Sequence, residues 1–505
     1  MKCPLEKLLS QGDDYSGPSM WPIKINYKHM KFLIGAFIAL GLSFACTSKK
    51  EVDLLIKNGA LIEVSTGEIF QNQVILIQGD SILLTGGDSL LTQFSGKTEI
   101  DATSKFILPG LWDNHVHFGG ADYVDENEQL LPLYLAFGVT AVRDAAGDIA
   151  PEVLKWRNEV NSGTRIGPRI FTSGPKIEGK NSIWPGDLEV GTVEELDQAL
   201  DSLDKLKVDF VKITDNALSP ELFLSATRKA KSRGWSVSGH VHPGITLDEI
   251  SLAGLTTIEH QGYLLRAATA EEMRIRDEKI SNKLSPEEAN ELQFSTLSDS
   301  VAESNFRKFA AQGTGVVPTL LISYNIAYLD SLNFSGDTIL SYLGPKLKES
   351  YQWRIERYAK EDSTSRKNRK LQFEAAARLL PLVQKSGMKI IAGTDAGYLN
   401  TYDYPGLAIH RELALMVKYG LSPLQALQAS ILNGPSYFGL EKEYGSVEAG
   451  KRASLVILNS NPLEKIENTL SIESVIAEGK YYSREELDRM LSEIKAWVKT
   501  KESKE

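Results

Sequence analysis

The spacing of apolar residues predicts β-structure near both ends of the chain. From Val52 to Phe106, short apolar runs such as "VDLLIKNG" and "VILIQGDSILLTG" are separated by Gly, Asn and Asp. Such alternation, broken by turn residues, is typical of strands joined by hairpins. The same pattern returns in "YGSVEAGKRASLVILN" and "IESVIAEGKYY", between residues 444 and 482. We therefore predict a composite β-sandwich domain made of residues 52–107 and 436–485, in which both ends of the chain meet.

Between these ends, short apolar strands alternate with amphipathic helices. Helical segments such as "TVEELDQALDSLDKLK" carry apolar residues three and four positions apart. The strand candidates are "KFILPGLWDNH", "GVTAVRDAAG", "RIGPRIFTSG", "DFVKITD", "WSVSGHVHP", "TTIEHQG", "GVVPTLLIS" and "MKIIAGTDAG". This pattern predicts an α/β fold, with a parallel (β/α)8 TIM barrel over residues 108–435. A doubly wound open sheet is the alternative, but no glycine-rich phosphate turn opens any of these helices.

Two segments are longer than a minimal barrel requires. Residues 263–312 and 325–385 are charged and have a helical pattern. Long insertions in compact enzymes usually form lids or walls over a site. We expect both segments to shape a binding site.

Composition narrows the functional class. The chain has 505 residues, 42% hydrophobic and 24% charged residues, and a net charge of −10. The length predicts more than one domain, and the composition is globular. The negative charge argues against a nucleic-acid partner or a polybasic membrane patch. Because both cysteines, Cys3 and Cys46, lie near the N-terminus, neither disulfides nor a cysteine–zinc site is expected in the body of the protein.

An export signal is predicted before residue 47. The segment "MKFLIGAFIALGLSFAC" begins at Met30 and is apolar from Phe32 to Ala45, which is too short to span a bilayer but suits a signal peptide. With Ala45 before it, Cys46 resembles the lipidated cysteine of a bacterial lipoprotein. We expect Met30 to be the true start, residues 1–46 to be extension and signal, and the protein to be exported and membrane-anchored through Cys46, in the periplasm or at the cell surface. An ordinary signal peptide is the alternative.

The histidines are concentrated at the ends of predicted strands. The chain has 7 histidines, and five of them follow apolar strands: His115, His117, His240, His242 and His260. In a (β/α)8 barrel the C-terminal ends of the strands converge on one face, where the chemistry takes place. A single such histidine is more often structural, but a group of five favours a metal site.

Two further ionisable residues belong to the same pattern. Asp395 ends the eighth strand candidate, and Lys212 lies between Val211 and Ile213 in the fourth. A lysine inside an apolar strand is costly unless it is paired, modified or directed into a cavity. Imidazole and carboxylate are the ligands that Zn²⁺ uses when it activates water. Because i and i+2 residues of a strand point to the same side, His115 and His117 can bind one ion together.

In this order and spacing the motifs resemble the amidohydrolase superfamily, and more narrowly its imidazolonepropionase-like and Xaa-Pro dipeptidase-like branch. The resemblance runs from Val52 to about Tyr482 and includes "LPGLWDNHVH", "GVTAVRDAAG", "IEHQG", "AGTDAG" and "YGSVEAGKRASLVIL". The family usually has Ala-Asp-Leu where this chain has Ala453, Ser454 and Leu455. That departure falls outside the expected metal ligands.

The resemblance implies a two-metal centre. His115, His117 and Asp395 would bind one ion, His240 and His260 the other, and a CO2-derived carbamate on Lys212 would bridge them. It further implies a structural role for Arg143 and Asp144, and a role beside the ligands for Glu259. His242 and Tyr324 are candidate substrate contacts, although Tyr324 could equally serve packing.

The expected activity is therefore hydrolysis of a C–N bond in a small-molecule amide, cyclic amide or dipeptide-like substrate. A hydroxide bridging two divalent metals, Zn in the first instance, would attack the carbonyl, and Asp395 would move the proton. A mononuclear deaminase or imidazolone-type ring hydrolase is one alternative, since neither needs Lys212. A surface lipoprotein that keeps the barrel without catalysis is the other. A homo-oligomer is compatible with each of these functions.

Overall fold

A single β-sheet joins the two ends of the described chain. The computed structural model describes residues 49–145 and 147–504. Its largest sheet has the order β18-β17-β16-β5-β1-β2-β3, with β4 also paired to β1. The strands are β1 (Lys50–Glu63), β2 (Glu68–Gln78), β3 (Ser81–Gly86), β4 (Phe94–Asp101), β5 (Phe106–Pro109), β16 (Leu455–Leu458), β17 (Ile472–Ala477) and β18 (Lys480–Tyr482).

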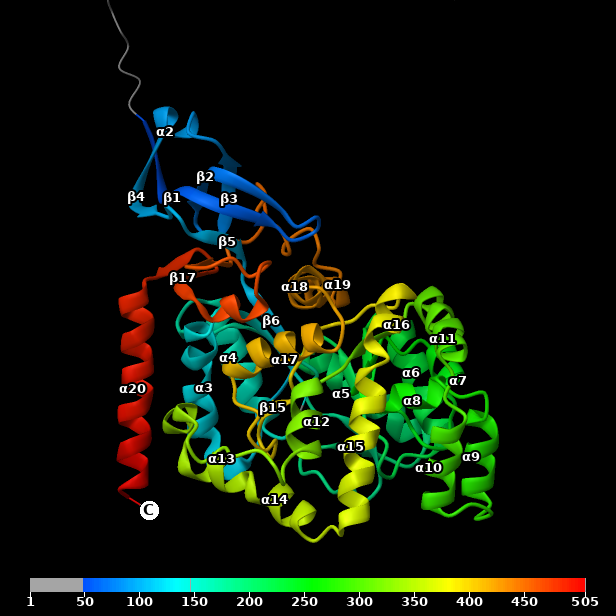
Figure 1. The fold of residues 1–505 in the computed structure, drawn as a ribbon. Coiled ribbons are helices and arrows are strands. Elements are labelled where there is room, and N and C mark those ends of the chain that lie inside the picture. Colours follow the sequence, from blue (N-terminus) through cyan, green and yellow to red (C-terminus); the bar gives the residue numbers. More distant parts are fainter. Residues whose placement is uncertain (1–48, 146, 505) are drawn as a thin grey trace, which may run out of the picture. The chain divides into compact units, whose positions relative to one another are not determined.

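The junction between the two ends is the antiparallel pairing of β5 with β16. Leu455 lies opposite Pro109 and Leu458 opposite Phe106. Apolar side chains from both ends, including Ile56, Ile107 and Ile457, pack into one buried cluster. Since burial of apolar surface is the main driving force of folding, this shared cluster keeps the ends together. The sheet lies at the top of Figure 1.

All strands of the other two sheets are parallel. One sheet has the order β15-β6-β7-β8 and the other β10-β9-β11-β12-β13-β14. Their bounds are β6 (Leu111–His117), β7 (Val139–Asp144), β8 (Arg169–Thr172), β9 (Ile177–Gly179), β10 (Leu188–Val190), β11 (Val211–Ile213), β12 (Val237–Gly239), β13 (Thr257–Glu259), β14 (Gly315–Val317) and β15 (Ala396–Gly397). Mixed α/β structure with parallel strands is therefore confirmed.

Backbone hydrogen bonds connect the two parallel sheets at two places. Asp209 N donates to Thr172 O at 2.9 Å, just before β11. On the other side Ile391 N donates to Val316 O at 2.9 Å, and Asn114 N donates to Ala392 O at 3.0 Å. These contacts bring β8 beside β11 and bring β14, the segment before β15, and β6 together.

Helices follow most of the parallel strands. Several begin at a side-chain cap: Thr246 and Glu249 form a reciprocal capping box at α7, and Ser422 and Gln425 form another at α18, which satisfies backbone N–H groups left free in a first turn. The α-helices are α2 (Leu90–Gln93), α3 (Val124–Ala136), α4 (Ala150–Asn161), α5 (Val193–Leu206), α6 (Pro220–Ser232), α7 (Leu247–Leu252), α8 (Leu264–Ala267), α9 (Glu272–Ile280), α10 (Pro286–Ser295), α11 (Asp299–Gln312), α12 (Leu320–Ala327), α13 (Pro345–Ser350), α14 (Gln352–Ala359), α15 (Ser363–Ala377), α16 (Leu380–Lys385), α17 (Leu407–Lys418), α18 (Pro423–Ile431), α19 (Asn433–Tyr437) and α20 (Arg484–Glu502).

Short 3-10 turns join several of these elements: η1 (Ala121–Tyr123), η2 (Gln261–Tyr263), η3 (Thr338–Tyr342) and η4 (Ile466–Leu470). The two long segments are helical, as their patterns predict, and contain α8–α11 and α12–α16. Among residues 49–145 and 147–504, no helix combines the length and the apolar composition needed to cross a membrane.

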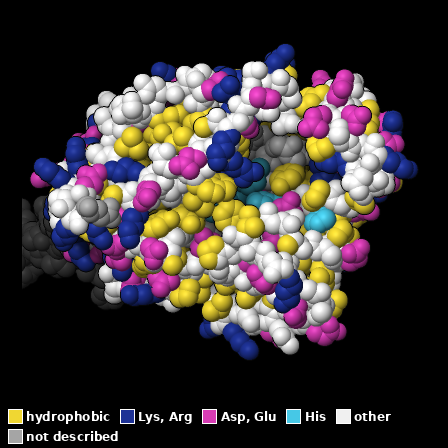
Figure 2. All heavy atoms as spheres, turned by 90° about the horizontal axis from the view of Figure 1, so that it is seen from below, with side chains coloured by type: hydrophobic (Ala, Val, Ile, Leu, Met, Phe, Trp, Pro, Cys, Tyr) yellow, Lys and Arg dark blue, Asp and Glu magenta, His cyan; other side chains and the backbone are white. Residues whose placement is uncertain are grey.

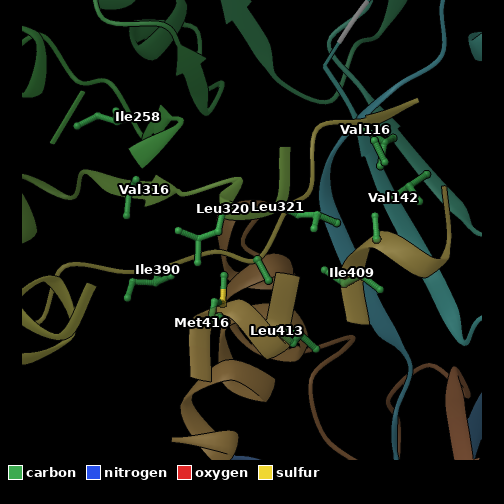
Figure 3. Close-up of a cluster of buried hydrophobic side chains, with 14 of the residues drawn as sticks. Val116, Val142, Ile258, Val316, Leu320, Leu321, Ile390, Ile409, Leu413 and Met416 are labelled. Atoms are coloured by element: carbon green, nitrogen blue, oxygen red, sulfur yellow. The ribbon is translucent and has the colours of Figure 1, made fainter. Parts of the chain in front are cut away.

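The main apolar core lies between the parallel strands and their helices. Val116, Val142, Ile258 and Val316 of the strands are buried together with Leu413 and other residues of α12 and α17 (Figure 3). The C-terminal helix α20, beyond the predicted domain limit of residue 485, also buries Leu487, Met490, Ile494 and Val498. Buried packing of this kind fixes the strand ends rigidly, so the side chains that follow them are held in place.

Candidate active site

Two histidines at the end of β6 point into one space. His115 and His117 are two residues apart on the strand, and their Nε2 atoms lie 3.3 Å apart. His115 is fully buried, whereas the side chain of His117 is 23% exposed. Their spacing places both rings on one side of the strand, as the sequence pattern predicts.

Asp395 immediately precedes β15, the strand paired with β6, and its carboxylate contacts both rings. Its Oδ1 lies 2.7 Å from His117 Nε2 and 3.2 Å from His115 Nε2. Its backbone has φ of +72°, a left-handed conformation that costs free energy in a residue with a side chain. Asp395 N donates to His115 O at 2.6 Å, and Asn400 Nδ2 donates to Asp395 O. These contacts hold the strained backbone that aims the carboxylate.

His240 and His260 form a second pair of facing rings, and their Nε2 atoms are 3.2 Å apart. His240 Nδ1 donates to Asp215 Oδ1 at 3.2 Å, and His260 Nδ1 is 2.7 Å from Thr319 Oγ1. Because Asp215 accepts the Nδ1 proton, the Nε2 of His240 presents a lone pair. Two imidazole nitrogens so placed favour a cation between them.

Lys212 lies between these groups on β11. Its side chain is fully buried, and among the described residues its Nζ has no hydrogen-bond partner. Burial lowers its pKa to about 8. Lys212 lines a cavity of about 100 Å³ together with His117, His240, His260 and Asp395. The described residues around Lys212 therefore leave its amine without a hydrogen bond.

Glu259 anchors the His115 side of the site from within the protein. Its Oε2 accepts the Nδ1 proton of His115 at 2.6 Å, and Arg143 Nη2 donates to both carboxylate oxygens at 2.8 and 2.9 Å. Ser238 and Thr257 also donate to Oε1. Burial alone would raise the pKa of Glu259, but Arg143 and His115 hold it well below its usual range.

Burial favours the neutral imidazole at His117, His240 and His260. It lowers the pKa of His117 to about 4 and also lowers the pKa of His240 and His260. Asp395 stays ionised, because His117 and His115 outweigh its burial and hold its pKa well below the usual value. Neutral imidazole and ionised carboxylate are the states that bind metal ions.

The donor set fits a divalent metal. His115, His260 and Asp395 each offer an atom within 4.8 Å of the others. Nitrogen and carboxylate donors whose remaining ring nitrogens are hydrogen-bonded are typical of catalytic zinc-like sites. The site is therefore able to hold at least one metal ion.

The remaining predicted residues lie elsewhere. His242 Nδ1 accepts from Gly244 N at 2.9 Å, and His242 does not line the cavity beside Lys212. Tyr324, on α12, packs against Tyr328 with the rings tilted and their centroids 4.8 Å apart, and its centroid lies 5.6 Å from that of Phe373. Cys46 lies outside the described residues.

Several functional candidates were not predicted from the sequence. Asp215 and Thr319 orient the two histidines of the second pair. Lys176, Trp184 and Arg354 line the cavity beside the metal ligands. Asp215 has one signal, since it ends the strand segment that contains Lys212. Thr319 lies within the seventh strand candidate, at a position that no pattern marks, and Lys176, Trp184 and Arg354 lie outside all strand candidates.

A second, larger cavity lies on the other side of His260. It has a volume of about 440 Å³ and is lined by His260, Tyr263, Ile326, Phe373 and other residues of α10, α14 and α15. Figure 2 shows a hollow with histidine side chains at its floor and cationic side chains at its edge. The long segments thus form walls around the site.

A family model described as the amidohydrolase family matches residues 106–481. The chain belongs to the amidohydrolase family. The match includes every strand that contributes a histidine, Lys212 or Asp395 to the site.

Several named proteins are similar to this amidohydrolase. Ochratoxinase from Aspergillus niger is 22% identical over 477 residues, which cover 83% of this chain and 84% of the relative. Among solved structures, a bottromycin amidohydrolase matches with a TM-score of 0.67 and 20% identity, covering 88% of this chain and 90% of the other. An Xaa-Pro dipeptidase with bound methionine matches with a TM-score of 0.61 and 20% identity, covering 85% and 99%.

Family membership and the site agree. This amidohydrolase is a metal-dependent hydrolase of carbon–nitrogen bonds, as the sequence predicts. The chemistry belongs at the strand ends, where the candidate ligands converge.

Proposed function

We propose that this amidohydrolase uses two metal ions bridged by a carbamate on Lys212. The observation that carries the proposal is the Nζ of Lys212, which is buried without a partner in the cavity between the histidine pairs. Reaction of the neutral amine with CO2 would form an N–C bond and release one proton to solvent, which gives a carbamate anion with two oxygen atoms able to bind metal. Such an anion removes the cost of a buried cation, because it can pair with the bound metals.

The ligand sets follow from the contacts. His115, His117 and Asp395 meet within 3.3 Å and would hold one ion. His240 and His260 would hold the second. Bound divalent ions, Zn in the first instance, would polarise the scissile carbonyl and lower the pKa of a water molecule.

The chain's own residues orient the histidine ligands and transfer a proton to the leaving group. Glu259 and Asp215 hold the Nδ1 protons of His115 and His240, so that each Nε2 stays free to bind. Asp395 is the carboxylate at the reacting centre, and we assign it the transfer of the proton from water to the leaving nitrogen. The walls made by the two long helical segments would limit access of bulk water.

The fold inferred for this site is a closed (β/α)8 barrel with a composite β-domain. Supporting it are the hydrogen bond from Asp209 N to Thr172 O, which links the start of β11 to β8, and those from Ile391 N to Val316 O and from Asn114 N to Ala392 O, which link β14 to β6 through the segment before β15. A closed ring of parallel strands would place all predicted ligands on one face. The β-sheet built from residues 50–109 and 455–482 would then be the companion domain.

The substrate class inferred is an amide or dipeptide-like compound. The cavity of about 100 Å³ at Lys212 suits a small polar part of a substrate, and the neighbouring cavity of about 440 Å³, with Tyr263, Ile326 and Phe373, suits a bulky apolar part. The names of ochratoxinase, bottromycin amidohydrolase and Xaa-Pro dipeptidase support the same class.

Metal content in Lys212→Ala tests the proposal. The wild type and Lys205→Ala, a control at an exposed lysine, should each bind two metals per chain. Lys212→Ala should bind one or none and should lose at least about 1,000-fold in kcat, because the bridging ligand is gone. One metal in every variant, with Lys212→Ala fully active, would favour a mononuclear deaminase or ring hydrolase instead.

An activity screen tests the substrate class. Metal-loaded enzyme should hydrolyse members of a panel of Xaa-Pro and other dipeptides, N-acyl amino acids and cyclic amides. His115→Ala, which removes a ligand, is the control and should be inactive. Activity that survives in His115→Ala would show that the reaction occurs elsewhere.

We also propose that the protein is exported and anchored through a lipid on Cys46, which lies outside the described residues. The supporting feature is the apolar run from Phe32 to Ala45 before that cysteine. Processing in a bacterial host should be blocked by globomycin and abolished in Cys46→Ser. Normal processing of Cys46→Ser would indicate an ordinary signal peptide.

A further inference from the structure

Arg354 is an arginine in the wall of the active-site cavity. It lies on α14, in the second long helical segment, and lines the cavity that also contains Lys212, His240 and Asp395. Among the described residues no carboxylate lies within ion-pair distance of its guanidinium. An arginine left without an anion beside a reacting centre is the usual receptor for a substrate carboxylate or phosphate.

The guanidinium is held in place on one side only. Nε donates to Leu399 O at 3.0 Å and Nη2 donates to Asn400 Oδ1 at 2.5 Å. The guanidinium carbon lies 5.5 Å from the ring centroid of Trp353. Nη1 has no hydrogen bond to a described residue. The side chain is therefore fixed before substrate binds, and this reduces the conformational entropy lost on binding. Its Nη1 remains available to donate to an incoming anion.

The other cation in the wall is already neutralised. Lys176 Nζ lies 3.2 Å from Asp148 Oδ1 and 3.1 Å from Asp187 Oδ1, both buried with it. Its charge is balanced within the protein, so it has less capacity for a substrate anion. Arg354 is thus the group best placed to select one.

We infer that Arg354 binds a free carboxylate adjacent to the scissile bond, and that the enzyme selects N-acyl amino acids and dipeptides over their amidated forms. This inference rests on the proposed function. It adds the residue that binds the substrate carboxylate, and it names amidated compounds as poor substrates. The small cavity holds the amino-acid part, and the larger cavity beyond His260 holds the acyl part.

Binding at Arg354 also reaches the reacting carboxylate. Arg354 donates to Asn400 Oδ1, and Asn400 Nδ2 donates to Asp395 O. Arg354 is therefore two hydrogen bonds from the strained backbone of Asp395, and a substrate carboxylate bound to it is three. This chain places the selecting group and the proton-transferring group in one rigid unit.

Matched substrates and variants test the inference. N-benzoyl-L-leucine and N-benzoyl-L-leucinamide differ only in the carboxylate. Wild type should prefer the acid, and Arg354→Gln should lower kcat/KM for the acid about 10- to 100-fold more than kcat/KM for the amide, with the additional loss mainly in KM. Arg354→Lys should recover part of the loss. Arg357→Gln is the control, because Arg357 also lies 5.5 Å from the Trp353 ring but does not line the cavity.

Calorimetric binding of the same two compounds separates this inference from the proposed function. If neither is hydrolysed but wild type binds the acid and Arg354→Gln does not, the inference stands and the choice of reaction fails. If both are hydrolysed without preference, or Arg354→Gln weakens both equally, the inference is overturned and the hydrolase assignment survives. If neither compound binds to wild type, the inference is also overturned.

Discussion

The two halves of the candidate metal site are built differently. On one side His115 is fully buried and its partner Glu259 receives hydrogen bonds from Arg143, Ser238 and Thr257. On the other side His240, 25% exposed, has one carboxylate partner, Asp215. A buried network of charged and polar groups has large energetic consequences when one member is lost, whereas a single partly exposed contact has small ones.

This difference suggests that the His115 half serves both folding and metal binding, whereas the His240 half serves mainly metal binding. The His115 half is continuous with the fold, because Arg143 on β7 and Glu259 on β13, strands of two different parallel sheets, form a fully buried ion pair. The His240 half faces the cavity and is supported by the loop residue Asp215. We therefore expect changes on the first half to affect stability and metal together, and changes on the second half to affect mainly the metal.

Glu259→Gln should have the largest effect. It leaves Arg143 buried without an anion, and breaking a buried ion pair in this way costs about 3–5 kcal/mol. Urea unfolding of metal-free protein measures the loss. Glu99→Gln, which removes an exposed partner of Lys57, should stay within about 1 kcal/mol of wild type. Equal stability of Glu259→Gln and wild type would mean that the network contributes nothing to folding.

His410, a histidine outside both halves, should give the next largest effect, and one that depends on pH. It is buried on α17, bonded to Thr469 Oγ1 and Phe137 O, and burial lowers its pKa to about 4. Between pH 6.5 and 4 the unfolded chain binds a proton that the folded chain does not, so stability falls as pH falls. The loss by pH 4.5 should be about 2–3 kcal/mol.

The control for that effect is His410→Gln, which has no titrating ring. Urea unfolding of metal-free wild type and variant at pH 7 and pH 4.5 should give a difference in unfolding free energy that changes by the same 2–3 kcal/mol. The histidines of the site titrate in both proteins and cancel. A difference that does not change with pH would mean that His410 is protonated in the folded state.

Much of the site could be predicted because its residues end apolar strands. His115, His117, His240, His260 and Asp395 each occupy a position where a hydrophobic run stops, and parallel strands bring such positions to one edge. Lys212 was found because it interrupts an apolar strand between Val211 and Ile213. Glu259 and Arg143 were identified from the motifs around them. Arg354 and Trp184 could not be found this way, because a helix and a loop bring them to the cavity only through tertiary packing. Thr319 was missed because its part in the site is a contact with His260 Nδ1 that only the folded chain makes.

The strand pattern was less accurate in its details. The first strand candidate is two strands, β5 and β6, which belong to different sheets, and β9 and β10 were not predicted. The eighth candidate is reduced to a bridge at Ile390 and to β15. At Asp395 the backbone has positive φ, and both Thr394 N and Asp395 N donate to His115 O. Regular strand pairing is therefore interrupted where Asp395 turns towards the site, and no residue pattern in the sequence predicts this interruption.

Asp215→Asn should change metal binding more than folding. The amide can still contact His240 Nδ1 but no longer pairs its charge with the imidazole, and such changes beside a ligand typically lower metal affinity about 10- to 100-fold. Competition with a chromophoric chelator measures the affinity of each site. Stability of the metal-free protein should change by less than about 1 kcal/mol. A loss of stability as large as that of Glu259→Gln would remove the distinction between the halves.

Tyr324→Phe should have the smallest effect of the four changes. Tyr324 packs through its ring on Tyr328, Phe373 and the Lys418 ammonium, at 4.8, 5.6 and 4.9 Å, and it lines neither cavity beside the metal ligands. Because phenylalanine keeps the ring, kcat/KM should stay within about twofold and stability within about 0.5 kcal/mol. Steady-state kinetics on the best substrate of the screen decides the point. A tenfold rise in KM would show that the hydroxyl contacts substrate, and would extend the functional region beyond the two histidine pairs and Arg354 to α12.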